Sequence, residues 1–102
     1  MKNPPEGLKV AACAVAALFQ QQESWEGARK MMADPAKFRQ MLLGYDRDNV
    51  PIKVIRHVQK NYTEHPQHSQ YFVPERAAKI SMALHSLVQW ISGLVLYRSI
   101  LE

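Results

Sequence analysis

The C-terminal stretch from Pro74 to Glu102 constrains the fold of this chain more than any other. No further proline occurs in it, and apolar residues recur at steps of three and four, the period of one face of an α-helix. These residues are Ala77, Ile80, Leu84, Leu87, Val88, Ile91, Leu94, Val95 and Leu101. A single helix here would be about 40 Å long at about 1.5 Å per residue. We expect it to run out of the domain into a coiled coil.

Shorter helices are predicted before this stretch from their start and stop signals. Asn3-Pro4-Pro5 stops any preceding structure and starts a helix whose inner stripe extends to Phe19. Ser24 is the expected N-cap of a helix over Trp25–Met32. Asp34 and Pro35 begin the next helix, which Gly44 ends.

The polar loop Tyr45–Asn49 follows, and Asn49 or Val50 is expected to cap a helix that Pro51 opens. The residues Thr63–Val73 form the loosest region, and their aromatic pair Tyr71-Phe72 is expected to pack against the last helix. Strand signals are poor. The sequence predicts one all-α domain over residues 1–102, a compact bundle of about five to six helices.

Composition narrows the possible partners. The net charge is +4 and the isoelectric point about 9.4, which favours nucleic acid, an anionic membrane or an acidic protein surface. The apolar run Val10–Phe19 is far short of the ~20 residues of a membrane span, so we interpret it as a buried helix. Cys13 is the only cysteine, which rules out an intrachain disulfide and fits a reducing compartment.

The usual signatures of catalysis are missing from the sequence. There is no phosphate-binding loop, no G-x-G-x-x-G, no H-E-x-x-H and no C-x-x-C. His65 and His68 have a spacing that metals use, but zinc needs more ligands than these two. Asp46 and Asp48 lack the twelve-residue calcium pattern and are expected to serve as loop and cap residues. We predict no catalytic residue, cofactor or metal site, and hence no enzyme.

Several segments, taken in order, carry a family resemblance. They are Asn3-Pro4-Pro5-x-x-x-x-Lys9, Trp25-x-x-Ala28-x-Lys30-Met31-Met32, Asp34-Pro35-x-Lys37-Phe38, Tyr45-Asp46-Arg47-Asp48-Asn49-Val50-Pro51, Val54-Ile55-Arg56, and Pro74-Glu75 with Ser81, Leu87, Trp90 and Tyr97. Together they resemble the microtubule-binding domain at the tip of the dynein heavy-chain stalk, and axonemal heavy chains more than cytoplasmic ones. Leu87-Val88, where the family often has cysteine, and Arg98 depart from its pattern.

The resemblance implies a helical bundle on an antiparallel coiled-coil stalk, formed by the chain before Asn3 and by the continuation of the last helix. It implies ATP-sensitive binding to the α- and β-tubulin of microtubules, with an affinity set by the register of the two stalk helices. ATP hydrolysis would occur elsewhere in the heavy chain, in a motor ring. The implied location is the axoneme of a cilium or flagellum, in the cytoskeleton.

The candidate contacts carried over from the family are cations expected to face outward. They are Lys9, Arg47, Lys53, Arg56, Lys60 and Arg98. The surface of tubulin is acidic, so outward cations would steer and hold binding in a salt-sensitive way. The alternative for each is an ordinary solvated helix charge, which is the interpretation we favour for Lys37 and Lys79.

Two other functions compete with this prediction. The basic helix Lys53–Lys60 could enter a nucleic-acid groove, but it lacks a preceding helix and turn with helix-turn-helix spacing, so we expect no nucleic acid. The domain could instead dock another subunit. Some outer-arm heavy chains carry a leucine-rich-repeat light chain on this domain, as the family implies. No membrane partner is expected.

Overall fold

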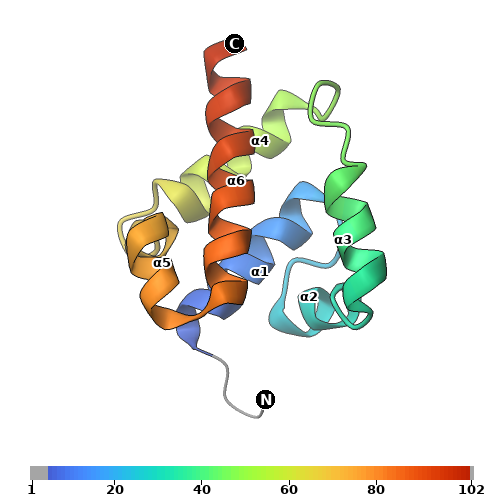
Figure 1. Cartoon of the computed structure of the whole chain (residues 1–102). Helices are drawn as coiled ribbons and strands as arrows, with labels where there is room; N and C mark the ends of the chain where they lie inside the picture. Colours follow the sequence, from blue (N-terminus) through green and yellow to red (C-terminus); the bar gives the residue numbers. More distant parts are fainter. Residues whose placement is uncertain (1–4, 102) are drawn as a thin grey trace.

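The helices of this chain surround α1, as the computed structural model shows for residues 5–101 (Figure 1). The elements are α1 (Glu6–Leu18), α2 (Trp25–Met31), α3 (Pro35–Leu43), α4 (Ile52–Val58), the π-helical turn η1 (Gln59–Thr63), the 3-10 turn η2 (Ser69–Phe72), α5 (Pro74–Ile80) and α6 (Met82–Leu101). No strand occurs within residues 5–101, so the predicted all-α bundle of five to six helices is confirmed. The start signal at Asn3-Pro4 lies outside the described residues.

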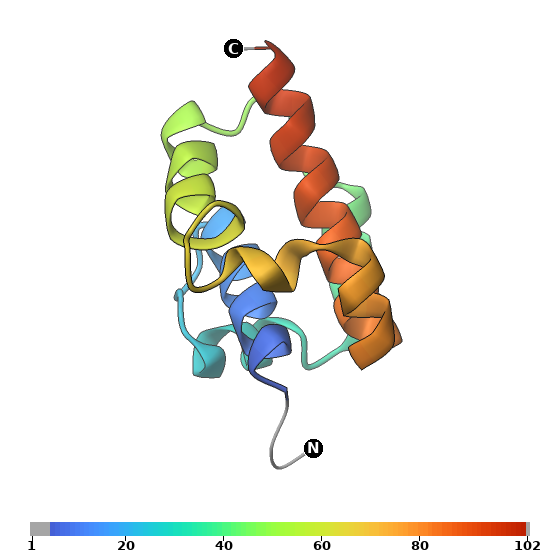
Figure 2. The ribbon, with the colours of Figure 1, turned by 90° about the vertical axis from the view of Figure 1, so that its left-hand side faces the viewer.

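The core forms on α1, a helix in which nine of thirteen residues are buried. Its alanines let neighbouring helices approach from several sides. Ala12 and Ala16 pack against Ala28 of α2, while Val15 and Leu18 join the main core with residues of α4 and α6. Figure 2 shows α4 and α6 on either side of the molecule with α1 between and below them. The helix that carries the apolar run of the sequence is therefore the support for the others.

The predicted caps of α2 and α3 are confirmed. The Ser24 hydroxyl accepts a hydrogen bond from the Gly27 amide at 3.0 Å, and the Asp34 carboxylate accepts one from the Lys37 amide at 3.3 Å. Each satisfies an N–H group that the first helical turn leaves without a partner. The turn before α2 is tight, because a Cβ atom on Gly27 would lie 2.4 Å from the Gln22 carbonyl oxygen.

The prediction of one unbroken helix from Pro74 onward is wrong. The chain breaks at Ser81, whose backbone is extended, with φ −166° and ψ 155°. The Ser81 hydroxyl accepts a hydrogen bond from the Leu84 amide at 3.0 Å and so caps the start of α6. The buried residues Ala77 and Leu84 lie on separate helices, α5 and α6, yet both join the same core. The helical spacing of apolar residues therefore continues across Ser81, and for this reason the sequence did not reveal the break.

The start of α4 also differs from the prediction. Pro51 precedes the helix rather than opening it, and neither Asn49 nor Val50 caps it with a side chain. The side-chain amide of Asn49 instead donates a hydrogen bond to the Asp46 carboxylate at 3.0 Å. The expected packing of Phe72 is confirmed, because its side chain is buried in the main core together with residues of α6.

Candidate functional site

A row of three exposed cations follows one side of α4 and η1. Lys53, Arg56 and Lys60 are spaced at three and four residues and are all exposed, as predicted. The opposite side of the same helix is buried through Val54, Ile55 and Val58. We call the three cations the α4 basic row. Because the apolar side is held in the core, the charged side is presented from a fixed support.

Lys9 belongs to the open strip of α1, the helix on which α4 packs. Glu6 is exposed, whereas Lys9 and Cys13, one turn further each, are half-buried. Burial raises the pKa of the Cys13 thiol, and the Glu23 and Glu6 carboxylates raise it further. Lys9 is therefore less exposed than the outward position predicted from the sequence, while Cys13 is a poor nucleophile because its thiol stays protonated.

Glu23 ties the loop after α1 to α4 and η1. Its carboxylate accepts a hydrogen bond from His57 Nε2 at 2.8 Å and a second from the Tyr62 hydroxyl. The Asn61 amide donates to His57 Nδ1 at 3.1 Å, which holds the ring in place. Burial raises the pKa of Tyr62, and its hydrogen bond to Glu23 raises it further. The Glu23 carboxylate is thus occupied by two donors from α4 and η1.

Arg98 does not face outward, and this prediction is wrong. Its side chain is only 6% exposed. One guanidinium nitrogen donates to the carbonyl oxygens of Arg47 at 3.0 Å and of Val50 at 2.5 Å. A buried cation needs such acceptors, because removing it from water is costly otherwise. Arg98 is therefore a structural residue that fixes the loop before α4.

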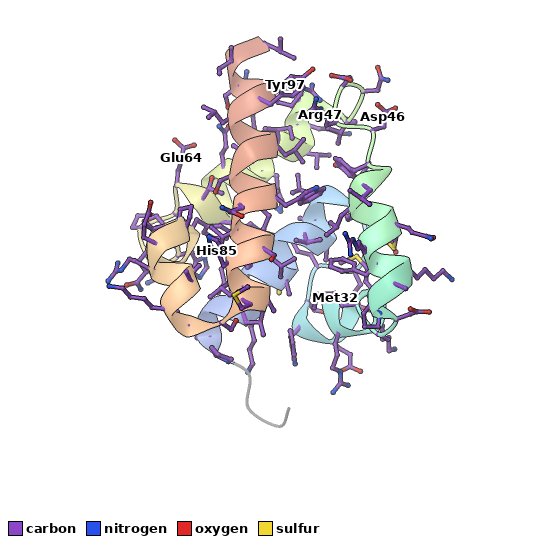
Figure 3. All side chains as sticks on the ribbon, viewed as in Figure 1. Met32, Asp46, Arg47, Glu64, His85 and Tyr97 are labelled. Atoms are coloured by element: carbon purple, nitrogen blue, oxygen red, sulfur yellow. The ribbon has the colours of Figure 1, made fainter. Side chains whose placement is uncertain are left out.

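Arg47 is exposed, as predicted, and lies against the end of α6 (Figure 3). The central carbon of its guanidinium is 4.3 Å from the centre of the Tyr97 ring, a cation–π arrangement. The Tyr97 hydroxyl donates to the Asp48 carboxylate, and this hydrogen bond is the main reason why the pKa of Tyr97 is raised. The loop side chains are thus oriented by α6.

Sequence analysis missed an aromatic cluster beside this loop. Tyr45, which we placed in a polar loop, makes edge contacts with Phe19 at 4.8 Å and with Trp90 at 5.3 Å between ring centres. Phe19 stacks on Trp90 at 5.9 Å, and the Tyr45 hydroxyl donates to the Leu18 carbonyl oxygen. Burial raises the pKa of Tyr45 to about 12. No local signal marked Tyr45 as a core residue.

One face of α6 remains open along its whole length. Its exposed residues follow alternating steps of four and three: Met82, Ser86, Gln89, Gly93, Leu96 and Ile100. Met82 is 79% exposed, Leu96 62% and Ile100 74%. This spacing is that of a coiled-coil contact line. We call these six residues the α6 outer seam. A groove of about 530 Å³ lies between α3 and α6, and Gln89 and Gly93 of the seam line it.

Comparison with known proteins agrees with the resemblance. Dynein axonemal heavy chain 6 from Homo sapiens is 28% identical over 100 residues, 98% of this chain. The Dynein-1-alpha heavy chain of the flagellar inner arm I1 complex from Chlamydomonas reinhardtii is 34% identical over 99 residues, 96% of this chain. The chain belongs to the dynein heavy-chain family. It spans about 2% of the length of each of these dyneins.

The dynein beta chain of the flagellar outer arm of Chlamydomonas reinhardtii is also similar, with 33% identity over 73 residues, or 72% of this chain and 2% of its own length. The relatives thus include both inner- and outer-arm dyneins by name. No protein-family model matches the chain. No solved structure matches it. The family assignment therefore rests on whole heavy chains, and the fold on the structure described above.

Two further features of this dynein segment bear on the site. Among the helices of residues 5–101, none combines the length and apolar character that a membrane crossing requires. Within the same residues, no three His, Cys, Asp or Glu side chains gather closely enough to hold a metal ion. His65 and His68 stack on each other with ring centres 4.7 Å apart, and His68 Nδ1 lies 2.9 Å from the Asn61 carbonyl oxygen.

Proposed function

We propose that this chain is the microtubule-binding domain at the tip of a dynein stalk, in the axoneme of a cilium or flagellum. The observation that carries the proposal is the α4 basic row, three exposed cations on a helix whose other side is buried in the core. Lys9 on α1, which is half-buried, and Arg47 in the loop before α4, which is exposed, are the other two candidate contacts. An acidic surface such as that of tubulin is the complement of such a row.

The α6 outer seam supports the stalk part of the proposal. Large apolar side chains of the seam are exposed near the two ends of α6, at Met82 and at Leu96 and Ile100, with polar or small residues between them. The opposite side of the helix is buried through Leu84, Val88 and Ile91. The proposed occupant is the incoming helix of the same heavy chain, which would precede Asn3 and run antiparallel to α6. A change of register between the two helices would then alter the affinity for microtubules in response to ATP.

Other parts of the heavy chain would hydrolyse ATP, and this domain would only bind the microtubule. We propose that the domain is not catalytic and that it needs no cofactor, because hydrolysis of ATP takes place in another part of the heavy chain. The partners of the domain would be the α- and β-tubulin of the microtubule and the rest of the heavy chain.

Cosedimentation with microtubules at increasing salt tests the proposal. The chain should pellet with microtubules, and added salt should weaken binding because exposed charge pairs are screened. Replacing Lys53, Arg56 and Lys60 together by glutamine should weaken binding by about three- to 100-fold, since each exposed contact contributes about 0.2–1 kcal/mol. A folded chain that ignores microtubules at low salt would refute the proposal.

A matched control separates a specific contact from general charge. Lys30, Lys37 and Arg39 are exposed on α2 and α3. Replacing them by glutamine also removes two lysines and one arginine, but away from the α4 basic row. This control should bind almost as well as the unaltered chain. Equal losses in the two triple variants would show that net charge, and not the α4 basic row, governs binding.

The alternatives are tested with the same protein. Duplex DNA added as a competitor should leave microtubule binding unchanged if the basic row faces tubulin. A pulldown with a leucine-rich-repeat dynein light chain tests the adaptor alternative. Capture of that light chain by a chain that does not bind microtubules would favour the adaptor over the proposed function.

A further inference from the structure

We propose that the end of α6 controls the microtubule contact by holding the loop before α4, with Arg98 as a positioning residue. This inference rests on the proposed function and adds a means of regulation to it. The residues concerned are Tyr97 and Arg98 of α6 with Arg47, Asp48 and Val50 of the loop. We call this group the α6–loop latch.

The latch grips the loop backbone through Arg98. The two carbonyl oxygens that accept from its guanidinium belong to Arg47 and Val50, at opposite ends of a short turn. Val50 is buried, and only Pro51 separates it from the first residue of α4. Because the donor is buried and charged, each hydrogen bond is stronger than an exposed neutral one. The start of α4 is thus fastened to α6.

The latch also orients the side chains of the loop through Tyr97. Its ring supports the Arg47 guanidinium at 4.3 Å, and its hydroxyl donates to Asp48. Figure 3 shows Arg47 of the loop and Tyr97 of α6 side by side near the C-terminal end of α6. Arg47 is therefore held in one direction instead of sampling many rotamers. A cation held in advance loses less entropy when it binds an acidic surface.

The latch lies on the same turn of α6 as the end of the outer seam. Leu96 and Ile100 flank Tyr97 and Arg98 in sequence but face outward, being 62% and 74% exposed. Any helix that packs on this part of the seam therefore bears on the turn that holds the loop. A shift of α6 relative to the bundle would displace Arg47 and the start of α4 together. Arg98 acts through them and does not itself touch tubulin.

Amide hydrogen exchange of the loop is the direct test of the latch. The amides of Asn49 and Val50 donate to the Asp46 carbonyl oxygen at 3.3 and 3.2 Å. Arg98→Met keeps most of the side-chain length but removes the donors, so exchange at both amides should become about tenfold faster. Arg98→Lys keeps a charged donor and should restore part of the protection. Arg39→Met, the same change on α3, should alter neither amide.

Microtubule affinity is the second readout, and Tyr97→Leu is the second variant. Tyr97 is half-buried but lies outside the main core, so its replacement should lower the melting temperature only slightly while it removes the support of Arg47. We expect a loss of affinity of about two- to fivefold, the range of an exposed cation–π contact. Arg98→Met should weaken binding by at least as much, and Arg98→Lys should recover part of it.

The outcomes separate the latch from the proposed function. If the unaltered chain does not bind microtubules, the proposed function fails, and the exchange experiment still decides whether Arg98 holds the loop. Unchanged exchange at Asn49 and Val50 in Arg98→Met would overturn the latch. Faster exchange with unchanged affinity would overturn the positioning role. If Arg98→Met also speeds exchange in α1, the protein is globally destabilised, and Tyr97→Leu then decides by its affinity.

Discussion

The helices α1 and α3 differ both in composition and in what they contribute to the core. Alanine, valine and leucine make up most of α1, whereas α3 mixes apolar residues with lysine, arginine and glutamine. Nine residues of α1 are buried, whereas α3 has none that is fully buried and presents Leu43 at 79% exposure. Both neighbourhoods contain cations, with Lys37 and Arg39 on α3. The proposed contact lies on α4, which packs on α1, and not on α3. The cations of the proposed contact therefore lie on a helix with a buried inner face, whereas those of α3 lie on a helix without one.

The largest expected effect is on the α1 side of this comparison. Leu18 is fully buried in the core, and Leu18→Ala should lower the free energy of unfolding by about 2–5 kcal/mol through lost burial and a residual cavity. Leu43→Ala makes the same change on α3 and should alter it by no more than about 0.5 kcal/mol. Urea denaturation of both variants measures the difference. Similar values would contradict the unequal roles of the two helices.

A smaller effect is expected where the two regions meet, at Trp90. Its ring is half-buried. It stacks on Phe19, which follows the last residue of α1, and makes an edge contact with Tyr45, which follows α3. Trp90→Ala should cost about 3 kcal/mol, the low end for a buried aromatic, measured as a lower urea midpoint. Hydrogen exchange in the variant should rise more in α3 than in α1. An unchanged midpoint would show that the aromatic cluster does not hold α3.

The smallest effect concerns pH. Burial raises the pKa of Tyr45 to about 12 from an ordinary value of 10.0. A raised pKa in the folded state means that the neutral phenol is favoured there, so its stabilisation is complete below pH 10 and is lost as pH rises toward 12. Tyr45→Phe should therefore make the fall in stability above pH 10 shallower. The measurement is the urea midpoint from pH 8 to 11, and an identical slope in both proteins would refute it.

The parts of the fold that depend on local sequence were predictable. Ser24 and Asp34 cap helices because their side chains reach amides three residues away, and α1 follows from one run of small apolar residues. The break at Ser81 was not predictable in this way, since Ala77 and Leu84 preserve the helical period across it. Tyr45 was missed because its partners Phe19 and Trp90 are distant in sequence.

Arg98 shows what the sequence could have revealed about the site. It follows Ile91, Leu94 and Val95 at helical spacing, so it lies on the buried face of α6 and not on the outer one. Its charge suggested exposure, while its position on the helix indicated burial. The exposed row Lys53, Arg56 and Lys60 was placed correctly because Val54, Ile55 and Val58 define the inner face of α4 unambiguously.

Gly27 gives one more consequence of the structure. A methyl group there would collide with the Gln22 carbonyl oxygen, and displacement of Gln22 would carry away the neighbouring Glu23, which accepts from His57 and Tyr62. Gly27→Ala would therefore disturb the contacts of α4 and η1 with Glu23, although it replaces no ionisable residue. A search for functional residues that considers only charged side chains would miss this need for glycine at position 27.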